Sequence, residues 1–126
     1  MKTVTNRRNS LGRLQHEYQK VDPQMFAFDV DTAICTLRSH QTIYLSLSGR
    51  RASLTDAGYT LSSFEYSMFD ETQKQLLTEV LNQTGVEMDP DYEFHKDTQL
   101  DEIDQELENM AIVIRMVKQI QYHNDH

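Results

Sequence analysis

Residues 100–121 read LDEIDQELENMAIVIRMVKQIQ, and this stretch carries the strongest structural pattern in the chain. Its apolar residues recur at alternating steps of three and four, which is the spacing of the a and d positions of a heptad. The pattern predicts a long amphipathic helix over residues 98–122, with Asp97 or Thr98 as its cap. Such a seam needs a covering surface, either inside the fold or between subunits. The residues of this expected partner or dimer interface are Leu100, Ile103, Leu107, Met110, Ile114 and Val117.

The charges along this helix are sorted by sign. Acidic residues come early and basic residues come late, an order that complements the helix dipole. The early residues Asp101, Asp104 and Glu108 form a candidate acidic contact surface. The whole chain has a net charge of −8 and a pI of about 4.9. Because phosphate binding depends on Lys and Arg, this balance favours a protein partner over nucleic acid or an anionic membrane.

The length and composition of the chain limit the architectures that it can adopt. A chain of 126 residues is expected to form one domain, here residues 9–126, after a flexible basic arm at residues 1–8. Its hydrophobic content of 38% is low, against about 45–50% for a typical globular protein. Either the protein is unusually polar, or part of its apolar surface is buried against a partner. No stretch approaches the roughly 18 apolar residues of a membrane span, and the first residues lack a secretory signal, so a cytoplasmic location is expected.

The first half of the chain combines a helical pattern with alternating ones. Residues 9–20 have apolar positions at helical spacing and predict a first helix. Residues 25–30 are short, apolar and alternating, which indicates a strand. Residues 42–48 alternate strictly and consist largely of strand formers, so we expect a second strand that pairs with an earlier one at 33–37. A helix over 31–48 fits the same residues less well and stays open.

In the second half of the chain, the residues that start and end each element are easier to identify. Residues 59–69 predict a third strand, although a helix also fits them. Residues 70–84 predict a helix with a capping box at its start and Gly85 as its left-handed stop. Residues 86–96 form an acidic link to the last helix. The predicted fold class is therefore α+β, a small antiparallel sheet with two or three helices, and the alternative is an all-α bundle.

No stretch of the sequence carries a recognisable catalytic or ligand-binding signature. The chain lacks a nucleophile elbow, a P-loop and a dinucleotide-binding fingerprint. Its single Cys35 lies in an apolar run and is expected to be buried. Residues 87–93 alternate acids like the start of a calcium loop but lack its Gly and its final Glu. His123 and His126 have the spacing of metal ligands without a third ligand nearby. We therefore expect no catalytic residue, metal or cofactor.

A short basic segment resembles part of a DNA-binding fold. Residues 50–58 run from Arg50 and Arg51 into Leu-Thr-Asp-Ala-Gly, which resembles the wing of winged-helix transcription factors. The resemblance implies a candidate basic contact at the two arginines. The acidic balance of the chain argues against it, and the simpler interpretation of residues 49–58 is a polar, exposed connection.

The order of predicted elements, the size, the acidic pI and the last helix together resemble class I type III secretion chaperones. In that comparison the strands fall at 26–37, 42–48 and 59–66, and the middle and last helices at 70–84 and 100–121. The family usually places a strand pair between these two helices, where residues 86–96 offer room for one short strand. The resemblance implies a cytoplasmic homodimer around which an extended segment of an effector wraps. The apolar residues expected to hold it are Ile43, Leu45 and Leu47, or Tyr59, Leu61 and Phe64.

Three functions remain open from the sequence. The first is a non-enzymatic, dimeric protein-binding module, a chaperone or adaptor for a secreted or regulated partner. The second is a small inhibitor of the kind that phages and plasmids encode, whose acidic surface blocks a nucleic-acid-binding protein. The third is a winged-helix-like regulator. The first accounts best for the amphipathic helix and the absence of catalytic motifs.

Overall fold

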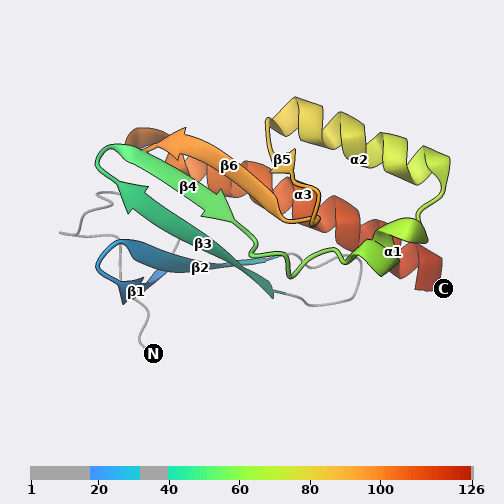
Figure 1. Ribbon diagram of the computed structural model, residues 1–126, viewed down its shortest axis with the longest axis horizontal. Helices are drawn as coiled ribbons and strands as arrows, with labels where there is room; N and C mark the ends of the chain where they lie inside the picture. The colour runs from blue at the N-terminus through green and yellow to red at the C-terminus, as the bar shows by residue number, and fades with distance from the viewer. Residues whose placement is uncertain (1–17, 32–39, 126) are drawn as a thin grey trace.

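The computed structural model describes residues 18–31 and 40–125, which form an antiparallel sheet with a long helix across one face (Figure 1). This confirms the α+β class. The six strands lie in the order β1-β2-β3-β4-β6-β5. The strands are β1 (Tyr18–Asp22), β2 (Met25–Asp31), β3 (His40–Ser48), β4 (Arg51–Thr55), β5 (Glu87–Met88) and β6 (Phe94–Gln99). The helices are α1 (Ser63–Ser67), α2 (Glu71–Thr84), the 3-10 turn η1 (Leu100–Glu102) and α3 (Ile103–Asp125).

Strict alternation in the strands decides which face of the sheet is buried. Phe26 in β2 pairs with Leu45 in β3, which pairs with Leu54 in β4, and all three point to the inner face. Tyr18 of β1 extends this face, with its ring 5.6 Å from that of Phe26, and burial raises the pKa of its phenol. The positions between them are mostly Ser, Thr and charged residues, so the outer face is polar, as is common for antiparallel sheets.

Helix α3 covers the inner face of the sheet, and the heptad seam is the contact. The helix packs against β3, β4, β6 and α2. Leu100 lies in η1 and is partly buried at the border of the core. The other five seam residues have no exposed surface in the single chain: Ile103, Leu107, Met110, Ile114 and Val117. The assignment of this seam to a dimer or partner interface is therefore wrong: the sheet of the same chain already covers it.

Helix α2 follows the prediction closely. Asp70 accepts a hydrogen bond from the N–H of Gln73, and the Gln73 side chain accepts one from the N–H of Asp70, which completes the capping box. Gly85 ends the helix in the left-handed conformation with φ +75°. The ammonium of Lys96 in β6 lies against this end, 3.3 Å from the carbonyl of Thr84 and 3.3 Å from Glu106 of α3. This lysine ties the sheet, α2 and α3 together.

Replacing Gly85 by alanine should destabilise the fold by about 2 kcal/mol, because a left-handed alanine is strained and its Cβ would displace the Nζ of Lys96 from Thr84 and Glu106. Gly49→Ala is the matched control. Gly49 also has a positive φ, +64°, but a Cβ there meets nothing within 4 Å, so we expect a loss of about 1 kcal/mol. Urea denaturation measures both. Equal losses would contradict the role given to Lys96.

Several element predictions in the N-terminal half are wrong or fall outside the described residues. Residues 18–20, predicted as the end of a helix, belong to β1, because Tyr18 joins the apolar inner face of the sheet. Residues 51–55, predicted as a polar connection, form β4, because Ala52 and Leu54 are buried between polar neighbours. The predicted arm at 1–8, the rest of the first helix and the strand at 33–37 with Cys35 lie outside the described residues.

Three predictions in the second half are also corrected. Residues 59–69 contain α1 and no strand, because a capping box starts a helix there. Residues 86–96 form a hairpin rather than a link, since Asp89 accepts hydrogen bonds from the N–H groups of Asp91 and Glu93 and so closes the turn between β5 and β6. Asp97 and Thr98 belong to β6 instead of capping the last helix, which begins at Ile103.

Candidate protein-binding surface

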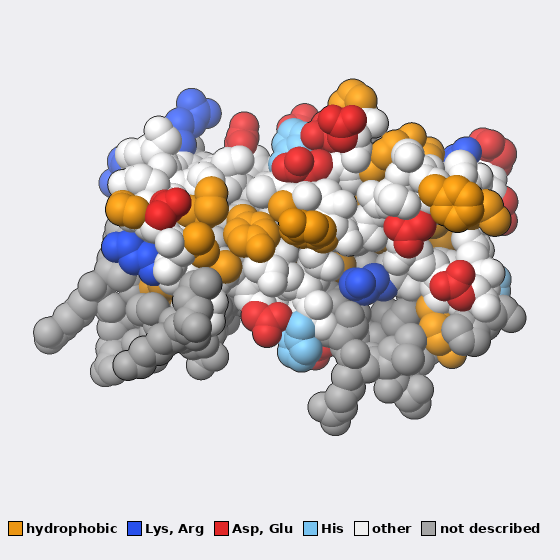
Figure 2. Space-filling view, turned by 60° about the horizontal axis from the view of Figure 1, so that its bottom comes forward, with side chains coloured by type: hydrophobic (Ala, Val, Ile, Leu, Met, Phe, Trp, Pro, Cys, Tyr) orange, Lys and Arg blue, Asp and Glu red, His pale blue; other side chains and the backbone are white. Residues whose placement is uncertain are grey.

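The largest exposed apolar side chains lie on and beside the short helix α1. Phe64 is 72% exposed and Met68 is 61% exposed, and none of the five residues of α1 is buried. We call Phe64 and Met68 the α1 ridge. Figure 2 shows large hydrophobic side chains at the right-hand end of the molecule, where α1 and the end of α3 lie in Figure 1. Exposed groups of this kind mark contact surfaces more often than isolated apolar residues do.

Aromatic packing fixes the direction in which the α1 ridge points. The ring of Tyr66 lies 5.7 Å from that of Phe69, which is buried, and 5.0 Å from that of Tyr92 in the β5–β6 turn. The ammonium of Lys74 lies 5.1 Å from the centre of the Tyr66 ring. Since Tyr66 and Phe69 anchor α1 to the body of the molecule, the other side of the helix, with Phe64, faces solvent.

A buried aspartate holds the loop that leads into α1. Asp56 has no exposed surface, and its carboxylate accepts hydrogen bonds from the N–H groups of Gly58, at 2.9 Å, and Thr60, at 3.2 Å. It accepts a third from the N–H of Phe94 in β6, at 2.9 Å. Thr55 donates a further hydrogen bond to Glu93. These bonds fix the start of α1 against the sheet, so the α1 ridge stands on a rigid support.

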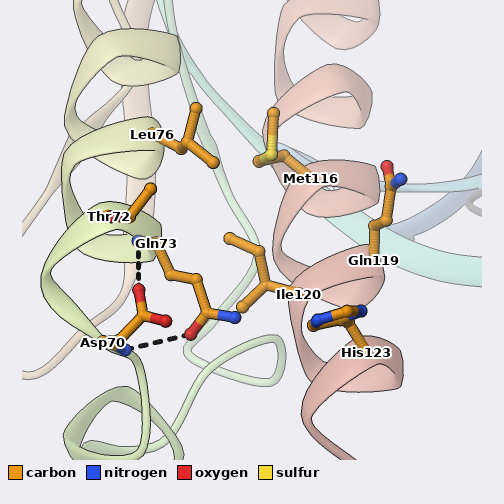
Figure 3. Close-up of a pocket in the computed structure, with 8 residues that line it drawn as sticks. All are labelled: Asp70, Thr72, Gln73, Leu76, Met116, Gln119, Ile120 and His123. Atoms are coloured by element: carbon orange, nitrogen blue, oxygen red, sulfur yellow. Dashed lines mark hydrogen bonds between the residues drawn. The ribbon is translucent and has the colours of Figure 1, made fainter. Parts of the chain in front are cut away.

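A recess lies between α2 and α3, close to the ridge. It has a volume of about 470 Å³. Figure 3 shows Leu76 of α2 and Ile120 of α3 pointing into the space between the helices, with Met116 beside them. Leu76 is 41% exposed although it belongs to the helix face turned toward α3. The residues that line this α2–α3 recess are Asp70, Thr72, Gln73, Leu76, Met116, Gln119, Ile120 and His123.

The last turns of α3 separate the ridge from the recess. Asn124 accepts a hydrogen bond from the side-chain amide of Gln73, at 2.8 Å, and Gln121 donates one to the carbonyl of Thr60, at 3.1 Å. A smaller hollow of about 160 Å³ borders the ridge on the other side of α3, between α1 and residues 121–125. The end of α3 is thus flanked by an apolar projection on one side and an apolar depression on the other.

The apolar residues expected to hold a partner divide between core and surface. Ile43, Leu45 and Leu61 are buried, and Leu47 is partly buried against the core, so these residues are not available. Tyr59 and Phe64 are 75% and 72% exposed. Met68 and Leu76 are exposed and Met116 is only partly buried, which the helical spacing of the sequence does not indicate. Their exposure depends on how α1, α2 and α3 pack together, which no local pattern reports.

The two charged candidate surfaces are neighbours. Asp101 and Glu108 are exposed and Asp104 is partly buried, at the start of the C-terminal helical segment. Arg50 and Arg51 are exposed in and beside the β3–β4 turn, and the carbonyl of Arg50 accepts a hydrogen bond from the N–H of Leu100. Opposite charges therefore lie side by side at this end of the sheet. Such mixing weakens the single-sign field that either phosphate mimicry or DNA binding requires.

Two histidines of the described residues lie close to carboxylates. His40 lies 3.6 Å from Asp29, and His95 lies 3.8 Å from Glu87, each between neighbouring strands. Within residues 18–31 and 40–125, no three His, Cys, Asp or Glu side chains come together in a group that could hold a metal ion. None of the helices described is both long and apolar enough to cross a membrane.

Comparison with known proteins gives a family. The comparisons found no curated protein and no solved structure that matches the chain. A family model described as "Domain of unknown function DUF1828" matches residues 37–117. The match runs through β3, β4, α1, α2, β5 and β6 and ends within α3. It covers more than half of the chain, and the chain therefore belongs to the DUF1828 family.

Proposed function

We propose that this protein is a non-enzymatic protein-binding module, a chaperone or adaptor that acts as a homodimer in the cytoplasm. The observation that carries the proposal is the α1 ridge, where Phe64 and Met68 stand exposed on a rigidly held helix. Aromatic and Met side chains of this kind are the anchors of protein interfaces. The rigid support lowers the entropy lost when they bind.

The order of elements is a second support. The hairpin of β5 and β6 lies between α2 and α3, as the resemblance to class I type III secretion chaperones implies for its middle and last helices. Arg50 lies beside the acids of the last helical segment, so basic and acidic groups are mixed at this end of the sheet. This mixture of charges favours a protein-binding function over an acidic inhibitor or a DNA-binding regulator. Both alternatives need a surface with charge of one sign.

Capture of a partner from the native host tests the proposal. Tagged wild-type protein should retain at least one host protein that the double variant Phe64→Ser, Met68→Ser loses. The purified partner should then bind the variant with a Kd at least about tenfold higher, because truncated anchor residues are the costly ones at interfaces. Quantitative mass spectrometry and titration calorimetry measure the two effects.

Val21→Ser is the matched control for this experiment. Val21 is an apolar residue of β1, 42% exposed, on a strand that does not contribute to the α1 ridge. It should retain the same partner with unchanged affinity. If every captured protein binds the double variant as tightly as it binds the wild type, the α1 ridge is not the binding surface and the proposal fails.

A further inference from the structure

We propose that the partner protein inserts a Lys or Arg side chain into a hollow beside the α1 ridge, so that it binds through a segment that is both apolar and basic. This inference rests on the proposed function, because it names the chemistry of the partner that the α1 ridge binds. The hollow lies between α1 and residues 121–125 of α3 and has a volume of about 160 Å³. We call it the α1–α3 hollow. Both residues of the α1 ridge, Phe64 and Met68, line it.

The apolar wall of the α1–α3 hollow suits the carbon chain of a basic residue. Phe64, Met68 and Phe69 form this wall. Lys and Arg side chains bury their methylene groups along such a surface and keep the charged end accessible. The exposed ring of Phe64 can in addition attract a cation to its face. A cavity of about 150 Å³ holds a benzene molecule, so the hollow has room for one side chain of this kind.

Two carboxylates line the hollow, those of Glu65 and Asp125, and both residues are exposed. One oxygen of Glu65 accepts the hydrogen bond from the N–H of Ser62 that belongs to the capping box of α1, at 2.9 Å. Its other oxygen can accept a bond from an ammonium or guanidinium group. Among the described residues, no Lys or Arg lines the hollow. A partner's basic residue would therefore meet two carboxylates and no like charge.

The end of helix α3 makes the hollow more negative. This helix spans 23 residues, and its C-terminal end carries the negative partial charge of the helix dipole. A cation is the stabilising group at such an end, yet Asp125 stands in this position. The basic residue of the last turn is His123, which lines the α2–α3 recess instead. A cation supplied by the partner would offset both the carboxylate and the helix end.

The other polar groups of the hollow are already engaged within the chain. Gln121 donates its hydrogen bond to the carbonyl of Thr60, and the amide of Asn124 exchanges hydrogen bonds with that of Gln73. These bonds hold the end of α3 in place beside α1. The carboxylates are therefore the charged recognition groups of a preorganised site, and such a site loses less entropy on binding.

Selection of peptides tests the chemistry of the partner. The probe is a library of random peptides displayed on phage and selected against the wild-type protein. We expect the selected peptides to combine an apolar residue with Lys or Arg and to lose binding to Phe64→Ser. The same selection on the double variant Glu65→Gln, Asp125→Asn should give apolar peptides without the preference for Lys and Arg. Because Gln also serves in a capping box, α1 should stay folded in this variant.

A synthetic copy of one selected peptide gives the size of the effect. Its Kd for the double variant should be at least about tenfold higher than for the wild type, because charge-assisted hydrogen bonds are lost. Raising the salt concentration from about 50 to 500 mM should weaken binding to the wild type more than binding to the variant. Asp101→Asn with Glu102→Gln is the matched control. It removes the same charge from exposed residues of η1, at the other end of the helical segment, and should leave the Kd unchanged. Fluorescence anisotropy measures the affinities.

Three outcomes would overturn the inference. Peptides that bind through Phe64 without a preference for Lys and Arg would reject the basic anchor, while the protein-binding function of the α1 ridge would stand. Basic peptides that bind the variant Glu65→Gln, Asp125→Asn as tightly as the wild type would place their contact elsewhere. A selection without any peptide that depends on Phe64 would count against the inference and the proposed function together.

Discussion

Ile114→Asp is expected to unfold the protein, and not to release folded subunits. Ile114 has no exposed surface and lies in the middle of the α3 seam, beneath the sheet. A carboxylate placed there would be buried without a partner, at a cost of about 5 kcal/mol or more. That is comparable to the whole stability of many single domains. Circular dichroism should show loss of the native helical and strand signal at room temperature.

Ile112→Asp is the matched control for this substitution. Ile112 lies two residues away on the same helix and is 43% exposed, so the same change should cost at most about 1 kcal/mol, from helix propensity and lost contact. Together the two variants distinguish a seam that is buried within one chain from a seam that is buried between two chains. A folded Ile114→Asp protein with half the mass of the wild type would show that the seam forms a subunit interface.

Asp56→Ala should be the most damaging substitution of a polar residue. It removes the acceptor of three backbone N–H groups, those of Gly58, Thr60 and Phe94. Buried donors left without an acceptor carry a large penalty, and the carboxylate bonds that are lost are stronger than neutral ones. We expect a loss of about 3–5 kcal/mol and a fall of roughly 10–20 °C in Tm.

Asp56→Asn should be milder than Asp56→Ala. The amide keeps one oxygen, which can serve Gly58 and Phe94, while its NH₂ group would face the N–H of Thr60. Thermal and urea denaturation of both variants measure the order. Because Asp56 fixes the loop before α1, both variants should also weaken whatever binds the α1 ridge. An alanine variant as stable as the wild type would contradict the anchoring role of Asp56.

The elements that the sequence predicts well are those whose signals are local. Each step of the α3 seam and the capping box of α2 span about one helical turn, and the alternation of β2 and β3 lies within single strands. Helical spacing identified six seam residues that need a covering surface, and five of them are fully buried. It could not say whether the covering surface belongs to the same chain, because a seam has the same spacing in both cases.

The missed elements depend on contacts that are distant in the sequence. β4 is short, begins with Arg51 and buries a small Ala52, so its strand character depends on pairing with β3 and β6. The role of Asp56 depends on Phe94, which is 38 residues away. The α1 ridge faces solvent on the side of α1 opposite to Tyr66, which packs against Tyr92 of the β5–β6 turn. None of these contacts produces a recognisable pattern in the local sequence.

Hydrogen exchange at two protein concentrations tests most directly the claim that the α3 seam is covered within one chain. As the concentration rises from below to above the dimer midpoint, the residues that gain protection should lie outside the seam. Residues 103–114 should stay equally protected at both concentrations, because the sheet of the same chain covers them. Protection of residues 103–114 that increases with protein concentration would contradict the account.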